Sequence, residues 1–230
     1  MNNHAPVITI DGPSGAGKGT ISQLIAIKLG FHYLDSGALY RLLVLAARRH
    51  AVDLKNVESL AVLAAHMDIF FGINSEFESQ TLLEGEDVSA LIRGEDIGAD
   101  ASTVASYLKV RVALLSRQRA FVKSPGLVAD GRDMGTVVFP DADAKIFLTA
   151  NPEIRAKRRH KQLMDKGKDA ILVELIEQIK ERDERDMARK FSPMVPAHDA
   201  VIIDSSHMSI NEVLEIGLKI AKKMAYIPSK

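Results

Sequence analysis

The chain has 230 residues, of which 47% are hydrophobic and 26% are charged, and these proportions are typical of a globular protein with one sizeable core. Thirty Lys and Arg residues balance thirty Asp and Glu residues, and this zero net charge argues against a general nucleic-acid-binding protein. The absence of cysteine excludes disulfides, cysteine-rich zinc sites and thiol catalysis.

Apolar segments are short throughout the chain. No apolar run exceeds the length of residues 42–47, which is far too short to span a membrane. The first residues, MNNHAPVITIDG, lack the basic stretch and apolar core of a secretory signal. We therefore expect a cytoplasmic protein that has no membrane partner.

The predicted elements begin with a strand, a glycine-rich loop and a helix. Val7–Asp11 is mostly β-branched and apolar, which predicts a buried strand. The stretch GPSGAGKGT follows at residues 12–20, and residues 21–29 have helical spacing that ends at Gly30. Strand, loop and helix in this order are typical of a phosphate-binding loop.

The next segment predicts a short strand, two helices and a small insert. Residues 31–34 fit a strand, Asp35-Ser36-Gly37 can cap a helix that runs to about residue 50, and a second helix covers residues 57–67. From residue 68 to about residue 98, apolar residues alternate weakly between turn signals. We therefore expect a β-rich insert at about residues 65–100 within a single domain that covers residues 1–230.

The second half of the chain alternates short apolar strands with helices. Helices are predicted at residues 101–121, 153–166 and 169–189, strands at residues 127–130, 145–149 and 200–204, and a capping box at Ser209 and Glu212 opens the final helix. This alternation predicts an α/β fold with a parallel sheet covered by helices. Ligands then bind at the carboxyl ends of the strands. Four residues follow predicted strand ends: Gly12, Asp35, Gly131 and Thr149.

The glycine-rich loop contains the residue types that bind phosphate groups. Its glycines allow backbone N–H groups to surround a phosphate, and the following helix adds a positive N-terminal end. Lys18 supplies a mobile cation for the β- and γ-phosphate oxygens. The usual pattern places Ser or Thr directly after the lysine, but here Gly19 takes that place and the hydroxyl follows at Thr20. The residues that we expect to bind the nucleotide are Gly12, Pro13, Ser14, Gly15, Ala16, Gly17, Lys18, Gly19 and Thr20. Thr20 is the candidate Mg²⁺ ligand, although phosphates and water can hold that ion almost alone.

The signature GxxGxGKGT resembles that of the nucleoside monophosphate kinases, in which Gly after the lysine is common. A kinase also needs a site for the group that receives the phosphoryl, and such a site should be rich in arginine because it brings two anions together. Ser36 begins a predicted helix and Arg41 follows about one turn later; the alternative is a plain helix cap with a surface arginine. Arg132 and Asp133 follow a buried strand; the alternative is a turn with an internal salt bridge. Asp130 ends that strand, where a second acid associated with Mg²⁺ could lie.

A charged stripe runs along the predicted helix 169–189. Apolar residues 175 and 179 are followed at helical spacing by Arg182, Asp186 and Arg189, so the buried stripe continues into charged residues. Buried charges need partners or a ligand. A bound ligand and an internal salt-bridge ladder both remain open.

Basic residues also follow the predicted strand that ends at Thr149. Arg155, Arg158 and Arg159 lie in the helix predicted after it. We expect a mobile lid at about residues 153–167 whose arginines reach the transferring group. The alternative is an exposed basic helix face.

Five stretches of the chain together resemble the bacterial cytidylate kinases, which belong to the nucleoside monophosphate kinases with a P-loop. They are GPSGAGKGT at 12–20, LDSGALYR at 34–41, LEGEDV at 83–88, ADGRDMGTVVFP at 129–140 and ERDERD at 181–186. The resemblance spans nearly the whole chain. It implies a P-loop kinase fold, transfer of a phosphoryl group from ATP with Mg²⁺ to CMP or dCMP, and a CMP-binding role for the insert.

The resemblance also implies roles for individual residues. Ser36, Ser102, Arg111, Asp133 and Arg189 match contacts to the base and phosphate of the acceptor. Arg41 and Arg132 match clamps on the acceptor phosphate, and Arg182 and Asp186 match contacts to its sugar. Lys18, Arg132, Arg158 and Arg159 are the residues that we expect to act on the transferring phosphoryl group.

Two other functions remain open on the sequence alone. The nearer one is a kinase of the same fold that acts on another monophosphate, on dephospho-coenzyme A or on shikimate. The more distant one is a nucleotide-hydrolysing switch or a nucleic-acid remodelling ATPase, against which the zero net charge argues. We expect small-molecule substrates, no nucleic-acid partner and a monomer.

Overall fold

The structure is a computed structural model that describes residues 5–73, 79–165, 167 and 169–224. The chain divides into two compact units. The first unit is built from residues 1–35 and 119–230, and the second from the uninterrupted segment Ser36–Gln118. Residues 74–78 of the expected insert and residue 166 of the expected lid lie outside the described residues.

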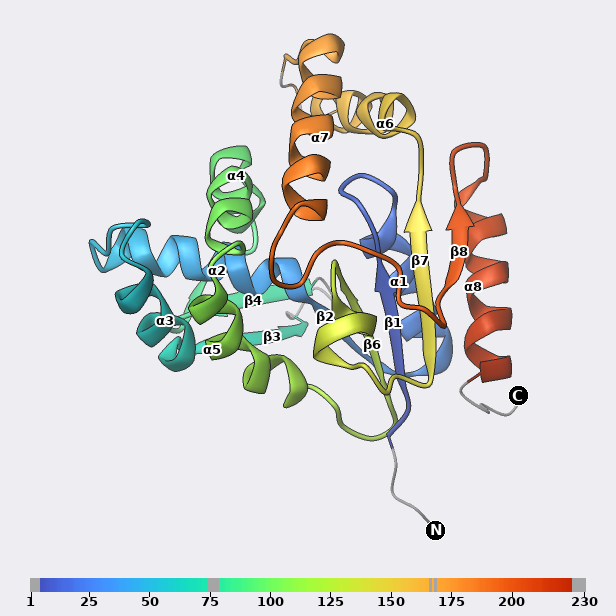
Figure 1. Cartoon of the computed structure of the whole chain (residues 1–230), viewed down its shortest axis with the longest axis horizontal. Coiled ribbons are helices and arrows are strands. Elements are labelled where there is room, and N and C mark those ends of the chain that lie inside the picture. Colours follow the sequence, from blue (N-terminus) through green and yellow to red (C-terminus); the bar gives the residue numbers. More distant parts are fainter. Residues whose placement is uncertain (1–4, 74–78, 166, 168, 225–230) are drawn as a thin grey trace. The chain divides into compact units, whose positions relative to one another are not determined.

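A five-stranded parallel sheet is the main element of the first unit (Figure 1). Its strands are β1 (Val7–Asp11), β2 (His32–Asp35), β6 (Leu127–Gly131), β7 (Ala144–Thr149) and β8 (Val201–Asp204), arranged in the order β2-β6-β1-β7-β8. Every residue of β1 and β6 is buried, as expected of central strands in a sheet flanked by helices. The predicted α/β fold is confirmed.

The carboxyl ends of these strands lie at one edge of the sheet. Asp11 is in register with Gly131, Asp35 with Asp130, and Thr149 with Asp204. The prediction that the loops after these strands gather at one edge is therefore confirmed. This edge carries the candidate site residues of the first unit.

Helices α1 (Lys18–Leu29) and α8 (Ile210–Met224) pack against each other and complete the core of the first unit. The core contains Ile8, Ile10, Ile21, Ile25, Val128, Ile146, Leu148, Ile203 and Val213. The predicted capping box opens α8, because the Ser209 N–H donates to the Glu212 carboxylate at 2.8 Å and the Glu212 N–H donates to Ser209 Oγ at 3.3 Å.

Helix α6 (Pro152–Met164) follows the carboxyl end of β7 and packs against α7 (Leu172–Met187) (Figure 1). Asn151 caps α6 by accepting a hydrogen bond from the Glu153 N–H at 3.1 Å. The two buried residues of α7 are both carboxylates, Asp183 and Asp186. Ion pairs therefore hold the buried side of α7, whereas apolar packing holds the buried side of α1.

The second unit contains five helical segments and a small antiparallel sheet. Its helices are α2 (Ser36–Arg49), α3 (Val57–His66), the short 3₁₀ turn η1 (Leu91–Arg93), α4 (Glu95–Val104) and α5 (Leu108–Arg119). Its strands β3 (Ile69–Ile73), β4 (Ser79–Leu83) and β5 (Glu86–Asp87) pair in that order. Helix α2 packs against α3 and α4.

Two predicted boundaries are wrong. Residues 101–121 form parts of two helices, and α4 begins at Glu95, within the stretch expected to be β-rich. In addition, Met134–Val138 forms a π-helical turn, η2, in the stretch for which the sequence left open a ligand site and a strand-end turn with an internal salt bridge. The backbone of this turn is contacted by Asp11, which is distant in sequence and is described below.

Candidate active site

The phosphate loop leaves β1 at Gly12 and reaches α1 at Lys18. Gly12 lies so close to β7 that a Cβ atom there would come within 2.0 Å of the Leu148 carbonyl oxygen. Gly17 caps α1 with a φ of 95°, in the left-handed region that favours glycine. Two of the loop glycines are therefore required by the shape of the backbone.

Three side chains hold the backbone carbonyls of this loop. Lys18 Nζ donates to the Pro13 oxygen at 3.0 Å, Arg155 Nη1 to the Ser14 oxygen at 3.0 Å, and Ser205 Oγ to the Ala16 oxygen at 3.1 Å. In a trans peptide the carbonyl and the following N–H point in opposite directions. The N–H groups that follow these carbonyls therefore face away from the three side chains, as a phosphate-binding loop requires.

Lys18 is more buried than the sequence suggested, with 6% of its surface exposed. Burial, together with the nearby charge of Arg132, lowers the pKa of the Lys18 ammonium to about 7 against the opposing charges of Asp130 and Asp11. A buried cation in such surroundings is stabilised by an anion. Lys18 and Arg132 therefore lie close enough for their charges to interact.

Asp130 lies beside Gly19, the residue that departs from the usual phosphate-loop pattern. One Asp130 oxygen lies 3.4 Å from the position that a Cβ atom on Gly19 would take, and it accepts a hydrogen bond from the Tyr33 hydroxyl at 3.0 Å. Burial raises the pKa of Asp130 to about 6, and the charge of Asp35 raises it as well, against the charge of Lys18. A side chain at position 19 would therefore contact the Asp130 carboxyl group.

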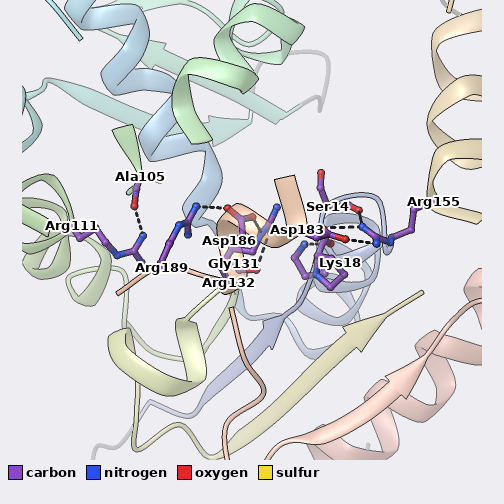
Figure 2. Close-up of polar contacts among 11 residues, drawn as sticks. Ser14, Lys18, Ala105, Arg111, Gly131, Arg132, Arg155, Asp183, Asp186 and Arg189 are labelled. Atoms are coloured by element: carbon purple, nitrogen blue, oxygen red, sulfur yellow. Dashed lines mark hydrogen bonds and ion pairs between the residues drawn. The ribbon is translucent and has the colours of Figure 1, made fainter. Parts of the chain in front are cut away.

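Asp186 lies between two arginines (Figure 2). Arg132 Nε donates to one carboxylate oxygen at 2.9 Å, and Arg189 Nη2 donates to the other. Burial alone would raise the pKa of Asp186, but the charges of Arg132 and Arg189 outweigh it and hold the pKa below its usual value. Of the salt-bridge ladder considered above, the pair of Asp186 and Arg189 is present, and the second partner of Asp186 is Arg132 from another element.

Arg155 joins the phosphate loop to α7 (Figure 2). Its guanidinium forms an ion pair with Asp183, and its Nε donates to the Ala150 oxygen at 2.8 Å. Arg158 instead donates to the Ser205 oxygen at 2.6 Å, and Arg159 donates to Gln162 at 3.4 Å. Of these three arginines, Arg155 is the one buried against the loop.

The turn after β6 is held by the last residue of β1. The two oxygens of Asp11 accept hydrogen bonds from the Met134 N–H and the Gly135 N–H, both at 2.8 Å. Burial raises the pKa of Asp11 to about 7, while the two N–H groups act in the opposite direction. Arg132 and Asp133 lie immediately before this turn.

The second unit contains the other predicted acceptor residues. Ser36 is buried at the start of α2, and Arg41 donates to the Ile92 oxygen at 2.9 Å. A Cβ atom on Gly98 would lie 3.3 Å from the Arg41 guanidinium nitrogens, which explains a glycine inside α4. Ser102 follows Gly98 by one turn, so it lies on the same face of α4.

Two further observations concern the acceptor residues of this unit. Ser102 Oγ is buried and has no hydrogen-bond partner among the described residues. Arg111 donates to the Ala105 oxygen at 2.9 Å and lies over the Tyr40 ring, 5.6 Å from its centre. A buried hydroxyl without a partner is a group that a ligand can satisfy.

The structure thus brings together some of the predicted residues within each unit. The first unit brings together Lys18, Arg132, Asp186 and Arg189. In the second unit, Arg41 of α2 lies against the side of α4 that carries Gly98 and Ser102. Sequence reasoning missed Asp11, Asp183 and Ser205. The position of Asp183 carried a signal, because residues 179, 183 and 186 follow the i, i+4, i+7 spacing of one helix face.

A parallel sheet whose first strand leads into this loop, with a buried lysine and arginine–carboxylate pairs at the same edge, defines a P-loop kinase. A model of the family described as "Cytidylate kinase" matches residues 8–223. The cytidylate kinase of Shewanella piezotolerans is 55% identical over 230 residues, which cover 100% of both chains. That of Stutzerimonas stutzeri is 60% identical over 216 residues and 94% of both chains. The chain belongs to the cytidylate kinase family.

A solved structure of a shikimate kinase from Bacteroides thetaiotaomicron aligns with 96% of this chain and 99% of its own, with a TM-score of 0.46 and 14% identity. Across the described ranges, no helix is both long enough and apolar enough to cross a membrane.

Proposed function

We propose that this protein transfers the γ-phosphoryl group of ATP to CMP and dCMP and so forms the corresponding diphosphates. The observation that carries the proposal is identity of more than half of the residues, over the whole length, to proteins named cytidylate kinase. The arginine–carboxylate groups described above support it, because arginine suits phosphate recognition.

The chemistry that we propose requires placement more than proton transfer. An oxygen of the acceptor phosphate attacks the γ-phosphorus of ATP, the bond from that phosphorus to the β–γ bridging oxygen breaks, and ADP leaves with the electron pair. The attacking oxygen is already ionised, so a dedicated general base is unnecessary. Lys18, Arg132 and the lid arginines Arg158 and Arg159 stabilise the negative charge on the transferring group.

The residues near the loop fit Mg²⁺. In the described part of the chain, no three His, Asp or Glu side chains form a metal site, and a cation held mainly by substrate phosphates and water needs only one or two protein oxygens. The Asp130 oxygen beside Gly19 and the Thr20 hydroxyl are the candidates. When bound, Mg²⁺ neutralises charge on the β- and γ-phosphate oxygens.

We infer the acceptor contacts from the family motifs and from the contacts within each unit. Arg41, Arg132 and Arg189 recognise the acceptor phosphate, and Arg182 and Asp186 recognise its sugar. Ser36, Ser102, Arg111 and Asp133 complete the recognition of the nucleotide. The insert and the lid at residues 153–167 retain the roles predicted above.

The proposal also covers the compartment, the oligomeric state and the partners of the protein. We propose that it acts as a cytoplasmic monomer on small-molecule substrates and has no nucleic-acid partner. The balanced charge and the lack of cysteine support these assignments. Sedimentation at several concentrations tests the monomer.

A kinase assay with a panel of acceptors tests the proposed function. CMP, dCMP, UMP, AMP and GMP are supplied separately with ATP and Mg²⁺, and ADP formation is followed together with the phosphorylated product. We expect CMP and dCMP to give the highest kcat/KM, and ATP hydrolysis without an acceptor to be slow. Preference for another monophosphate, or phosphate transfer mainly to water, would contradict the proposal.

A further inference from the structure

Asp11 connects the phosphate loop to the turn that carries Arg132 and Asp133. It is the last residue of β1 and is bonded directly to Gly12, the first residue of the loop. Its carboxylate also accepts two hydrogen bonds, each 2.8 Å long, from the Met134 and Gly135 N–H groups at the start of η2. One buried side chain on β1 therefore holds the turn that follows the neighbouring strand β6.

The turn has little freedom to move away from Asp11. A Cβ atom on Gly135 would lie 2.8 Å from Thr9 Oγ1 and 3.2 Å from Lys145 Cδ, so the backbone of the turn rests directly on β1 and β7. The Asp133 carbonyl accepts hydrogen bonds from the Val137 and Val138 N–H groups at 2.9 and 3.2 Å. The positions of the backbone before the turn therefore depend on how the turn is seated.

We propose that Asp11 is a positioning residue that sets where Arg132 and Asp133 stand relative to the phosphate loop, and thereby supports binding and reaction of the acceptor nucleotide. This inference rests on the proposed function, because it assigns Arg132 and Asp133 to the acceptor. Asp11 itself contacts neither substrate. It acts through the Met134 and Gly135 amides.

The variant Asp11→Asn tests this role. Asparagine keeps the shape of the side chain, but it replaces one acceptor oxygen with an NH₂ group that faces a backbone N–H. A hydrogen bond to a charged group is lost, so we expect kcat/KM for CMP to fall by at least about tenfold. The affinity for ATP, measured by calorimetry, should stay within about twofold because the loop keeps its own contacts to Arg155 and Ser205.

Asp143→Asn is the matched control. Asp143 accepts a hydrogen bond from the Val7 N–H at 2.8 Å, at the opposite end of β1. The same substitution there takes the charge from a carboxylate that binds the same strand, far from the turn, and leaves one oxygen that can still accept from the Val7 N–H. We expect it to lower the melting temperature without changing kcat or KM for CMP. An equal loss of acceptor kinetics in Asp143→Asn, or a change below about twofold in Asp11→Asn, would overturn the proposal.

A second variant, Gly135→Ala, disturbs the same contact from the side of the turn. It tests the proposal if Asp11→Asn does not fold. Gly135→Ala keeps the Asp11 carboxylate but pushes the turn away from Thr9. We expect the same acceptor-selective loss, and partial recovery when Thr9→Ala removes the closest atom. A folded Gly135→Ala protein with unchanged kinetics for CMP would overturn the proposal. So would Met134 and Gly135 amides that exchange with solvent in the wild-type protein as fast as exposed amides.

The failure of this inference is distinguishable from a failure of the proposed function. If the wild-type protein does not phosphorylate CMP, the proposed function is wrong, and the Asp11 comparison is then made with whichever acceptor the panel identifies. If the wild-type protein phosphorylates CMP and the variants do so equally well, only the role of Asp11 is wrong.

Discussion

Lys18 combines two properties that conflict, because its side chain is buried and its ammonium form carries a charge. Removing the charge of a side chain that stabilises a transferring group typically costs about 3–4 kcal/mol, or a hundred- to a thousand-fold in rate. We therefore expect Lys18→Ala to lower kcat to that extent. The melting temperature should not fall much, because a desolvated charge disappears. A variant that keeps half of the wild-type activity would contradict the phosphate-loop assignment.

The lowered pKa of Lys18 also predicts proton uptake when ATP binds. In the free protein the pKa is about 7, whereas the phosphates of ATP favour the charged form and raise it. Between about pH 7 and 10, binding of ATP should therefore take up a proton and weaken as the pH rises. Calorimetry in buffers of different ionisation enthalpy measures the uptake, which should be absent in Lys18→Ala.

The lowered pKa of Lys18 also makes the free energy of unfolding depend on pH. The folded pKa lies below the unfolded value of 10.5, so between about pH 7 and 10.5 the unfolded chain binds more protons than the folded protein. The contribution of Lys18 to the free energy of unfolding therefore rises with pH across this window. Below about pH 7 both states are protonated and the contribution is constant.

At the scale of elements, α7 is anchored by two carboxylates three residues apart that have different partners. Asp183 pairs with Arg155, which contacts the phosphate loop, whereas Asp186 pairs with Arg132 and Arg189. We expect Asp186→Ala to lower kcat/KM for CMP by at least about tenfold with little change in KM for ATP, because in the role proposed for it the carboxylate accepts a hydrogen bond from a sugar hydroxyl.

Asp183→Ala is the comparison for this prediction. Both variants break a buried ion pair, which destabilises a protein by about 3–5 kcal/mol, so both should melt earlier. Only Asp186→Ala should raise the KM for CMP, and Asp183→Ala should mainly affect ATP. If Asp186→Ala melts early but phosphorylates CMP with unchanged constants at low temperature, the ladder has a structural role and the sugar contact is wrong.

Elements whose signals are local could be predicted from the sequence, and those fixed by distant contacts could not. The five strands of the parallel sheet and the capping box at Ser209 depend on neighbouring residues, and their prediction is confirmed. The helical form of η2 had no local signal in the sequence, and the Met134 N–H at its start donates to Asp11, 123 residues away. Likewise, α4 contains Gly98, which weakens a helix locally but makes room for Arg41.

The sequence indicated the types of residue in the candidate site, but only some of the contacts between them. A charged stripe on α7 was visible in the sequence, yet the choice between a ligand and a salt-bridge ladder depends on Arg132, which lies in another element. Arg158 and Arg159 were expected to reach the transferring group, and this remains a prediction. Spacing along one helix cannot reveal that Arg155 is the arginine buried against the loop.

At the scale of the whole molecule, the division into two units predicts that donor and acceptor binding can be separated. The phosphate loop belongs to the first unit, and β3, β4 and β5 belong to the second. Replacing residues 69–87 with a short Gly-Ser linker should leave ATP binding intact and abolish CMP binding. The wider deletion of residues 68–98 would also remove the first turn of α4 and Gly98.

Calorimetry with each nucleotide checks this prediction, and retained ATP binding shows that the first unit is folded. Leu83 of β4 is fully buried, so some loss of thermal stability is expected in the second unit. A folded variant that binds CMP with normal affinity would show that the insert has another role.

The division of the chain into two units also affects the order in which its parts can fold during synthesis. The second unit is one continuous segment, whereas the first unit needs β1 to pair with β6, whose residues are synthesised much later. At about 5–20 residues per second, β1 waits on the order of 6 to 25 seconds on the ribosome for this neighbour. Residues 36–118 are synthesised within that interval, are complete shortly before β6, and can fold as a body. A folded segment between β1 and β6 has less conformational entropy left to lose when the two strands pair, which lowers the entropy cost of closing the loop between them.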